Sequence, residues 1–179
     1  MSKKPITLSC ACGRFNVELL GDPFVTAECH CASCRKGSQL LSALPTSHGV
    51  TAENGGTPYV LYRKDRVRFP DGTSLLRGYR LSDKAPTRRV VSTCCNTPIF
   101  VEFNGGHWLS LYASLWPSEA QPTMQIRTQV GDTPAGTSLD STLPAGFGTT
   151  AGFYAKLLAV WIAMGFKSPT IEVEEAHAR

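Results

Sequence analysis

Residues 28–36 read Glu-Cys-His-Cys-Ala-Ser-Cys-Arg-Lys and bring three cysteines, Cys29, Cys31 and Cys34, close together in the chain. Thiolates spaced one to three residues apart can reach a common point about 2.3 Å away, which is the distance that zinc keeps from sulfur ligands. Three ligands leave a fourth position for water, a substrate or a distant side chain, and an open position is usual at a catalytic zinc. The stretch therefore predicts an open zinc site.

Four further cysteines form two pairs, Cys10 with Cys12 and the adjacent Cys94 and Cys95. A four-sulfur site that joins segments so distant in the chain fixes topology rather than performing chemistry. We therefore predict a structural zinc here, in addition to the catalytic or open-site zinc. The two sites would use all 7 cysteines.

Disulfides are an alternative use of these thiols. A bridge within Cys-x-Cys or Cys-x-x-Cys is strained or redox-active, and an odd number of cysteines leaves one thiol over. Residues 1–5 are charged and no long apolar run precedes Cys10, so we expect no signal peptide and a reducing cytoplasm. A redox sensor that releases zinc when Cys29, Cys31 and Cys34 are oxidised is a further hypothesis.

Composition favours one domain over residues 1–179, rich in β-strands. The chain is 42% hydrophobic, and 16 Gly and 12 Pro interrupt it closely, which suits short strands joined by turns. The net charge of +4 is mild and fits an anionic small ligand as easily as nucleic acid. We do not expect a nucleic-acid partner.

Alternating apolar and polar residues predict the strands. They fall at residues 14–20, 39–45, 75–81, 88–93, 99–103, 108–115 and 124–130, with one or two exposed strands in the basic stretch 59–69. Residues 47–58 read as a surface loop, and Asn104-Gly105-Gly106 as a hairpin turn.

A linker at residues 131–148 precedes a predicted C-terminal helix at about residues 153–166. The helix is too short for a membrane span, which needs about twenty apolar residues, so we expect no membrane association. Its apolar side chains could pack on the sheet, form a homodimer interface, or line the ligand pocket with the linker as a hinge.

The histidines offer no clear fourth ligand for the open site. His30 lies between Cys29 and Cys31, and three consecutive ligands are geometrically awkward, so we expect His30 to orient the loop. His107 reads as a packing or surface residue, and His48 and His177 are more remote.

Three motifs together resemble a known family. They are Cys-Ala-Cys-Gly-Arg-Phe (residues 10–15), the stretch 28–36 quoted above, and Cys-Cys-Asn-Thr-Pro-Ile-Phe (residues 94–100). The series, with its core motifs at residues 10–103, is similar to the glutathione-dependent formaldehyde-activating enzyme (GFA) and centromere protein V-like family. The resemblance implies a mainly β, zinc-containing β-tent (Mss4-like) fold.

The resemblance also implies residue roles. Cys10 and Cys12 would join the late motif in a structural zinc site, and Cys29, Cys31 and Cys34 would be the catalytic ligands. The late motif of the family is usually Cys-x-x-Cys-Gly. Its first cysteine would fall here on Ser92 and its second on Cys95, so this chain resembles a branch with a Cys-Cys-Asn late motif. Whether Cys94 binds metal together with Cys95 stays open.

Active members of the family add glutathione to formaldehyde and are carbon-sulfur lyases. The resemblance therefore implies a zinc-dependent enzyme acting on a thiol-aldehyde adduct such as S-hydroxymethylglutathione. A zinc-bound thiol loses its proton, which prepares the thiolate that such chemistry needs. Arg35 is our candidate for binding a carboxylate of glutathione. The alternative is a non-catalytic zinc module that binds a small thiol, a protein or nucleic acid.

Overall fold

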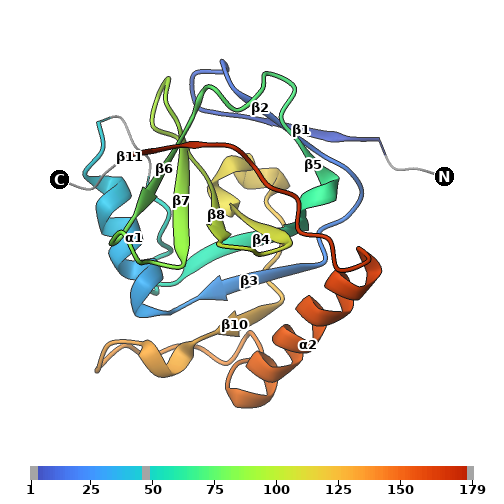
Figure 1. Ribbon diagram of the computed structural model, residues 1–179. Helices are drawn as coiled ribbons and strands as arrows, with labels where there is room; N and C mark the ends of the chain where they lie inside the picture. Colours follow the sequence, from blue (N-terminus) through green and yellow to red (C-terminus); the bar gives the residue numbers. More distant parts are fainter. Residues whose placement is uncertain (1–3, 46–48, 177–179) are drawn as a thin grey trace.

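The computed structural model describes residues 4–45 and 49–176, so His48 and His177 lie outside the described residues. The described part is mainly β, with two α-helices (Figure 1). The strands are β1 (Ile6–Ser9), β2 (Asn16–Leu19), β3 (Val25–Cys29), β4 (Thr57–Arg63), β5 (Val67–Arg68), β6 (Leu76–Arg80), β7 (Thr87–Ser92), β8 (Pro98–Phe103), β9 (Trp108–Tyr112), β10 (Ile126–Thr128) and β11 (Glu174–Ala176). The helices are α1 (Ala32–Ser42) and α2 (Phe147–Ala163), and short 3-10 turns η1 (Lys64–Arg66), η2 (Ala113–Leu115), η3 (Ser118–Ala120) and η4 (Val130–Asp132) lie between strands.

Two sheets form the body of the molecule. The smaller has the order β1-β2-β5, and the larger has the order β10-β3-β4-β9-β8-β7-β6-β11. Neighbouring strands are antiparallel except β10 with β3 and β11 with β6, which are parallel. The smaller sheet lies above the larger one in Figure 1, and α1 and α2 lie on opposite sides of the β3 and β10 edge.

Strand β4 runs through the middle of the larger sheet and is buried on both faces. Val60 and Tyr62 belong to the core cluster shared with the smaller sheet, whereas Tyr59 and Leu61 belong to the cluster on the α1 side. Because successive side chains point to opposite faces of a strand, β4 divides the two cores. The prediction of exposed strands over residues 59–69 was therefore wrong in burial, although β4 and β5 do lie there.

The predicted strand at residues 39–45 was also wrong, because residues 32–42 form α1. A short apolar run such as Leu40-Leu41 fits a strand or a buried helix equally well. A cap at the first turn favours the helix. Cys31 is the N-cap, and its Sγ accepts a hydrogen bond from the backbone N–H of Cys34 (3.2 Å). Leu41 is then fully buried against the sheet.

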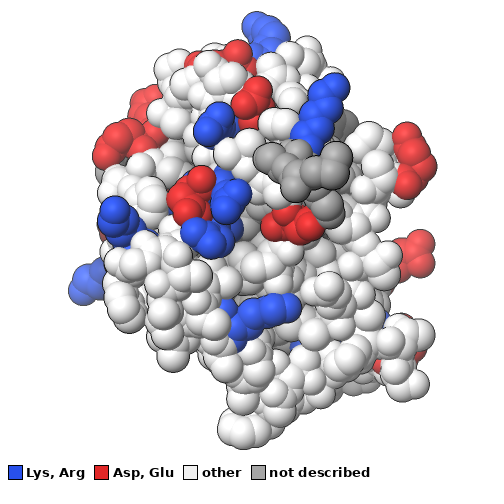
Figure 2. Space-filling view, turned by 90° about the vertical axis from the view of Figure 1, so that its right-hand side faces the viewer, with Lys and Arg blue, Asp and Glu red and all other residues white. Residues whose placement is uncertain are grey.

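The C-terminal helix α2 begins at Phe147, earlier than predicted, and ends at Ala163. It is attached to the sheet by few side chains: Leu157 is buried, and its carbonyl accepts a hydrogen bond from Nε2 of His107 (2.9 Å). The ring of His107 also stacks on Trp161. Figure 2 shows few charged side chains over the region of α2. His107 is thus a packing residue, as expected.

The remaining strand predictions agree with the structure, including the turn at Asn104 and Gly105 between β8 and β9. Strands β1, β3 and β11 were missed, although β3 carries Cys29 as its last residue. None of the helices in the described residues is long and apolar enough to cross a membrane.

Candidate metal centres

The three-cysteine group lies where β3 passes into α1. Cys29 is the last residue of β3, Cys31 caps α1, and Cys34 is in its first turn. The Sγ atoms of Cys29 and Cys34 are 3.4 Å apart, and the three Sγ atoms lie within 4.8 Å of one another. The strand-to-helix junction therefore turns the three thiols of the motif toward one point.

These distances fit a metal rather than a disulfide. In a tetrahedral site with zinc–sulfur bonds near 2.3 Å, neighbouring sulfurs are about 3.8 Å apart. A disulfide would require about 2.05 Å. The thiols of Cys29, Cys31 and Cys34 form no disulfide, and His30 is not among the residues whose ligand atoms converge. The donors of this group fit zinc, with one position of the tetrahedron left over.

The start of α1 favours a thiolate at Cys31. The neighbouring thiols of Cys29 and Cys34 and the backbone N–H of Cys34 hold the pKa of Cys31 well below its usual value. The hydrogen bond with Cys31 raises the pKa of Cys29 to about 11, and hydrogen bonds with Cys29 and Cys31 hold the pKa of Cys34 well above its ordinary value. Without a bound metal, one negative charge, on Cys31, is thus favoured in this group. Cys31 lies at the N-terminus of α1, which is the positive end of the helix dipole.

A cleft of about 230 Å³ opens over the three sulfurs. Its wall comes from β3, β4, β8, β9, the residues after β10, and α2. The lining residues are Ala27, Cys29, Cys31, Cys34, Tyr59, Leu61, Val101, Trp108, Ser110, Thr128, Gln129, Phe153 and Tyr154. The hydroxyl of Tyr59 donates a hydrogen bond to Sγ of Cys34 (3.5 Å). Burial raises the pKa of Tyr59 well above its usual value, so this hydroxyl keeps its proton.

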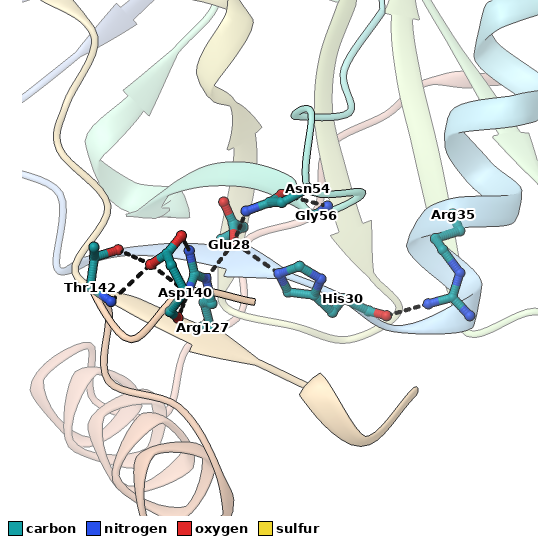
Figure 3. A network of polar contacts seen from close by, with 8 residues as sticks. All are labelled: Glu28, His30, Arg35, Asn54, Gly56, Arg127, Asp140 and Thr142. Carbon is teal, nitrogen blue, oxygen red and sulfur yellow. Dashed lines mark hydrogen bonds and ion pairs between the residues drawn. The ribbon is translucent and has the colours of Figure 1, made fainter. Parts of the chain in front are cut away.

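A buried polar network supports the same junction from behind (Figure 3). Oε1 of Glu28 accepts hydrogen bonds from Nε2 of His30 (2.8 Å), Nε of Arg127 (2.7 Å) and Nδ2 of Asn54 (3.0 Å). Burial would raise the pKa of Glu28, but these donors outweigh it and lower the pKa. His30 is therefore held as a partner of Glu28, in agreement with the orienting role expected for it.

The network also requires the backbone at Gly56 to lie close to the side chains of Glu28 and His30. A Cβ on Gly56 would collide with the side chains of Glu28 and His30. Arg127 extends the network to the exposed Asp140, whose Oδ2 lies 3.0 Å from its Nη2. The network therefore ties the cysteine junction to β10 and to the segment that leads into α2.

A second buried cation, Arg89 of β7, lies under the first turn of α1. It donates to the backbone carbonyl of Ser33 (2.9 Å) and to its hydroxyl (2.7 Å), and also to Thr87. None of its hydrogen bonds within the described residues goes to a carboxylate. Gly37 makes room for it, since a Cβ there would collide with the guanidinium. Arg89 thus places an uncompensated positive charge beside the group that contains Cys34.

Arg35 does not point into the cleft. Its Nη1 donates to the backbone carbonyl of His30 (2.5 Å), as Figure 3 shows. Arg35 is absent from the cleft lining. The structure therefore gives it a contact that stabilises the junction, and its predicted role toward a substrate carboxylate has no geometric support.

The four-cysteine group joins two turns. Cys10 and Cys12 lie between β1 and β2, and Cys94 and Cys95 lie in the tight turn between β7 and β8. Sγ of Cys10 is 3.6 Å from Sγ of both Cys12 and Cys94, and the Cys12–Cys94 distance is 3.4 Å. Sγ of Cys95 lies 3.9 Å from that of Cys94. These distances also match the edges of a zinc–sulfur tetrahedron.

Adjacent cysteines can share this group because the chain reverses sharply after them. Asn96 has a left-handed backbone (φ 53°), and its N–H donates to the carbonyl of Ser92. Cys95 contacts the hydroxyls of Ser92 (3.3 Å) and Thr97 (3.0 Å). Burial would raise the pKa of Cys95, but these hydroxyls lower it to about 5. Cys94, whose part in metal binding the motif left open, has its Sγ 3.6 Å from that of Cys10 and 3.4 Å from that of Cys12.

The two groups differ in the cavity that each faces, although Cys12 of the four-cysteine group is itself exposed. A cavity beside the four-cysteine group is lined by Ala11 and Thr97, among others, but by none of the four cysteines. The cleft over the other group has all three cysteines in its wall. The structure thus leaves the three-cysteine group accessible to a small molecule.

The basic stretch that begins in β4 does not form a continuous cationic surface. Lys64 is buried and paired with Glu102 (2.5 Å), and Arg63 is paired with Asp65 (2.6 Å). Arg88 is likewise paired with Glu102. This stretch gives no support to a nucleic-acid interface.

Comparisons with known proteins agree with this description. The model of the glutathione-dependent formaldehyde-activating enzyme family matches residues 5–130. A crystal structure of a Rhodobacter sphaeroides protein is similar at a TM-score of 0.44 and 15% sequence identity, covering 63% of this chain and 89% of that chain. No curated protein matches the chain. Because the family match covers most of the chain and includes both cysteine groups, the chain belongs to the glutathione-dependent formaldehyde-activating enzyme family.

Proposed function

We propose that this protein is a zinc-dependent carbon-sulfur lyase that forms or breaks the adduct of a small thiol with an aldehyde, of the S-hydroxymethylglutathione synthase type. The observation that carries the proposal is the cleft with three converging cysteine sulfurs in its wall. Cys29, Cys31 and Cys34 would hold a catalytic zinc, and Cys10, Cys12, Cys94 and Cys95 a structural one. The seven free thiols suit a reducing cytoplasm.

Zinc at the open site would supply a position for the substrate sulfur and keep that sulfur deprotonated. In the addition direction, the sulfur electron pair forms the carbon–sulfur bond, and the carbonyl oxygen takes a proton from water. Breakdown of the adduct reverses both changes. The bond change is internally balanced and needs no redox partner.

The residues of the chain prepare the site for this reaction. Tyr59 donates to Sγ of Cys34 and, since it keeps its proton, withdraws charge from that sulfur. Arg89 adds a buried positive charge beneath α1, next to a group that carries three thiolates when metal is bound. The Glu28 network fixes the backbone between Cys29 and Cys31. The apolar wall, including Trp108 and Phe153, limits the access of water.

The test is exchange between free and adduct-bound formaldehyde, measured by NMR on carbon-13-labelled formaldehyde with glutathione and zinc-loaded protein. The expected result is exchange faster than in buffer, and its loss in Cys34→Ser at unchanged fold. Thiol binding without faster exchange would instead support the non-catalytic zinc module. The absence of any thiol effect on the metal would contradict both.

A further inference from the structure

Among the residues that the structure describes, no Asp, Glu, Lys, Arg or His lines the cleft over the three cysteines. Four aromatic residues, Tyr59, Trp108, Phe153 and Tyr154, and three aliphatic residues, Ala27, Leu61 and Val101, make up most of its wall. Its other lining residues are the three cysteines and the uncharged Ser110, Thr128 and Gln129. A wall of this kind binds apolar groups and gives a carboxylate no cationic partner.

Three cations around the cysteine junction are already engaged. Arg35 donates to the carbonyl of His30, and Arg127 is held between Glu28 and Asp140. Arg89 is buried beneath α1 with its donors on Ser33 and Thr87. None of the three lines the cleft. The carboxylates of a peptide thiol would therefore find no cation in the wall of the cleft.

The size of the cleft gives a second constraint. Its volume is about 230 Å³. An apolar cavity of roughly 150 Å³ is large enough for benzene, so the cleft has room for one ring or a short alkyl chain beside the sulfur. The single carbon of a formaldehyde adduct would leave most of the aromatic wall without a partner.

We propose that the cleft takes an uncharged apolar group, about the size of a phenyl ring or a butyl chain, attached next to the sulfur that binds at the three-cysteine site. The proposal rests on the proposed function, because it assumes that the substrate sulfur binds at this site. The group can come from the thiol or from the aldehyde of the adduct. The substrate class is thus a thiol-aldehyde adduct with an apolar substituent.

Calorimetric titration of the zinc-loaded full chain tests the proposal with ethanethiol, 1-butanethiol and glutathione. Each buried methylene should tighten binding about fourfold, so 1-butanethiol should bind roughly tenfold to twentyfold more tightly than ethanethiol. Glutathione should bind less tightly than 1-butanethiol. A second arm compares exchange of glutathione adducts of benzaldehyde and formaldehyde, and it shows whether the aldehyde supplies the apolar group.

Three variants test whether the preference for 1-butanethiol over ethanethiol arises from the cleft. Val101→Phe should fill it and remove the advantage of 1-butanethiol while ethanethiol still binds. Tyr154→Ala, at a half-exposed position on α2, should reduce the advantage severalfold and does not depend on repacking of the sheet. Ile162→Phe adds a ring to the exposed surface of α2, outside the cleft, and should change nothing.

The outcomes separate the two claims. Equal affinity for the two alkanethiols, or tightest binding of glutathione together with no preference for the benzaldehyde adduct, would overturn the apolar substrate class and leave the proposed function intact. No binding of any thiol and no exchange of any adduct would overturn the proposed function and this inference together.

Discussion

The two cysteine groups both present Sγ atoms, but they differ in how far apart their residues lie in the chain and in whether a cleft opens over them. The four-cysteine group joins two turns that belong to different hairpins; Cys10, Cys94 and Cys95 pack against the core between the sheets, and Cys12 is exposed. The three-cysteine group comes from one junction, between β3 and α1, and faces a cleft. A metal held by cysteines from distant segments would therefore restrain the fold. A metal held by cysteines of one segment would depend on neighbouring residues to fix that segment, and would leave room for a substrate.

The largest expected effect is on the four-cysteine group. Cys10→Ser removes a ligand that links β1 to the turn after β7, so metal binding no longer contributes to folding. We expect the free energy of unfolding to fall by several kcal/mol, on the order of 5. Denaturant unfolding of the zinc-loaded protein measures this change.

The matched control for that change is Cys34→Ser, which removes a sulfur from the other group. It should cost less than about 1 kcal/mol of unfolding free energy, because both neighbouring ligands lie within a few residues in a folded helix and strand. An equal loss of stability in both variants would break the proposed contrast.

A somewhat smaller loss of stability is expected when the polar network around Glu28, next to the three-cysteine group, is broken. Arg127→Met leaves Glu28 buried without its cationic partner, and breaking a buried pair in this way costs about 3–5 kcal/mol. Since Glu28 precedes Cys29, zinc affinity at the open site should fall as well, while zinc at the four-cysteine site stays. Competition with a chromogenic chelator measures both affinities. Loss of both metals together would contradict the claim that the Glu28 network supports only the three-cysteine site.

The sequence was informative where chemistry is local. The spacing of Cys29, Cys31 and Cys34 predicted convergence on one point, and alternation located most strands. Local patterns failed where an unrecognised helix cap or tertiary contacts decide. The N-cap of Cys31 made a helix of residues predicted as a strand, and burial on both faces of β4 depends on the second sheet and on α1.

The supporting residues of the site could not have been found from local patterns. Arg127 and Glu28 are 99 positions apart, and Arg89 reaches Ser33 from β7. Tyr59 is an ordinary strand residue until β3 and β4 are paired. The choice between Cys94 and Cys95 also depended on the backbone of Asn96, which places both thiols near Cys10 and Cys12.

Metal removal should distinguish the groups by rate. A chelator added to the zinc-loaded protein should extract metal first from the three-cysteine group, because three protein ligands hold it rather than four, with little change in melting temperature. The second metal should leave slowly and with loss of structure. The measurement is chelator absorbance together with circular dichroism. Single-phase release that coincides with unfolding would show that the two groups are not different in kind.

The smallest expected effect concerns the outer end of the Glu28 network. Arg127 and the hydroxyl and N–H of Thr142 lower the pKa of Asp140 from 3.8. A lowered folded-state pKa means that this contribution to stability is present above pH about 3.8 and is lost as the pH falls through the folded value. The melting temperature of Asp140→Asn should thus lie below that of the unsubstituted protein at pH 6 and approach it below about pH 3. A gap that stays constant over this range would contradict the assignment.

Cadmium-113 NMR of the cadmium-loaded protein tests most directly the claim that the chain has one closed and one open thiolate site. The account predicts two resonances, of which only the one lost in Cys34→Ser shifts when 1-butanethiol is added. A single resonance, or a thiol-induced shift of the resonance that depends on Cys10, would contradict it.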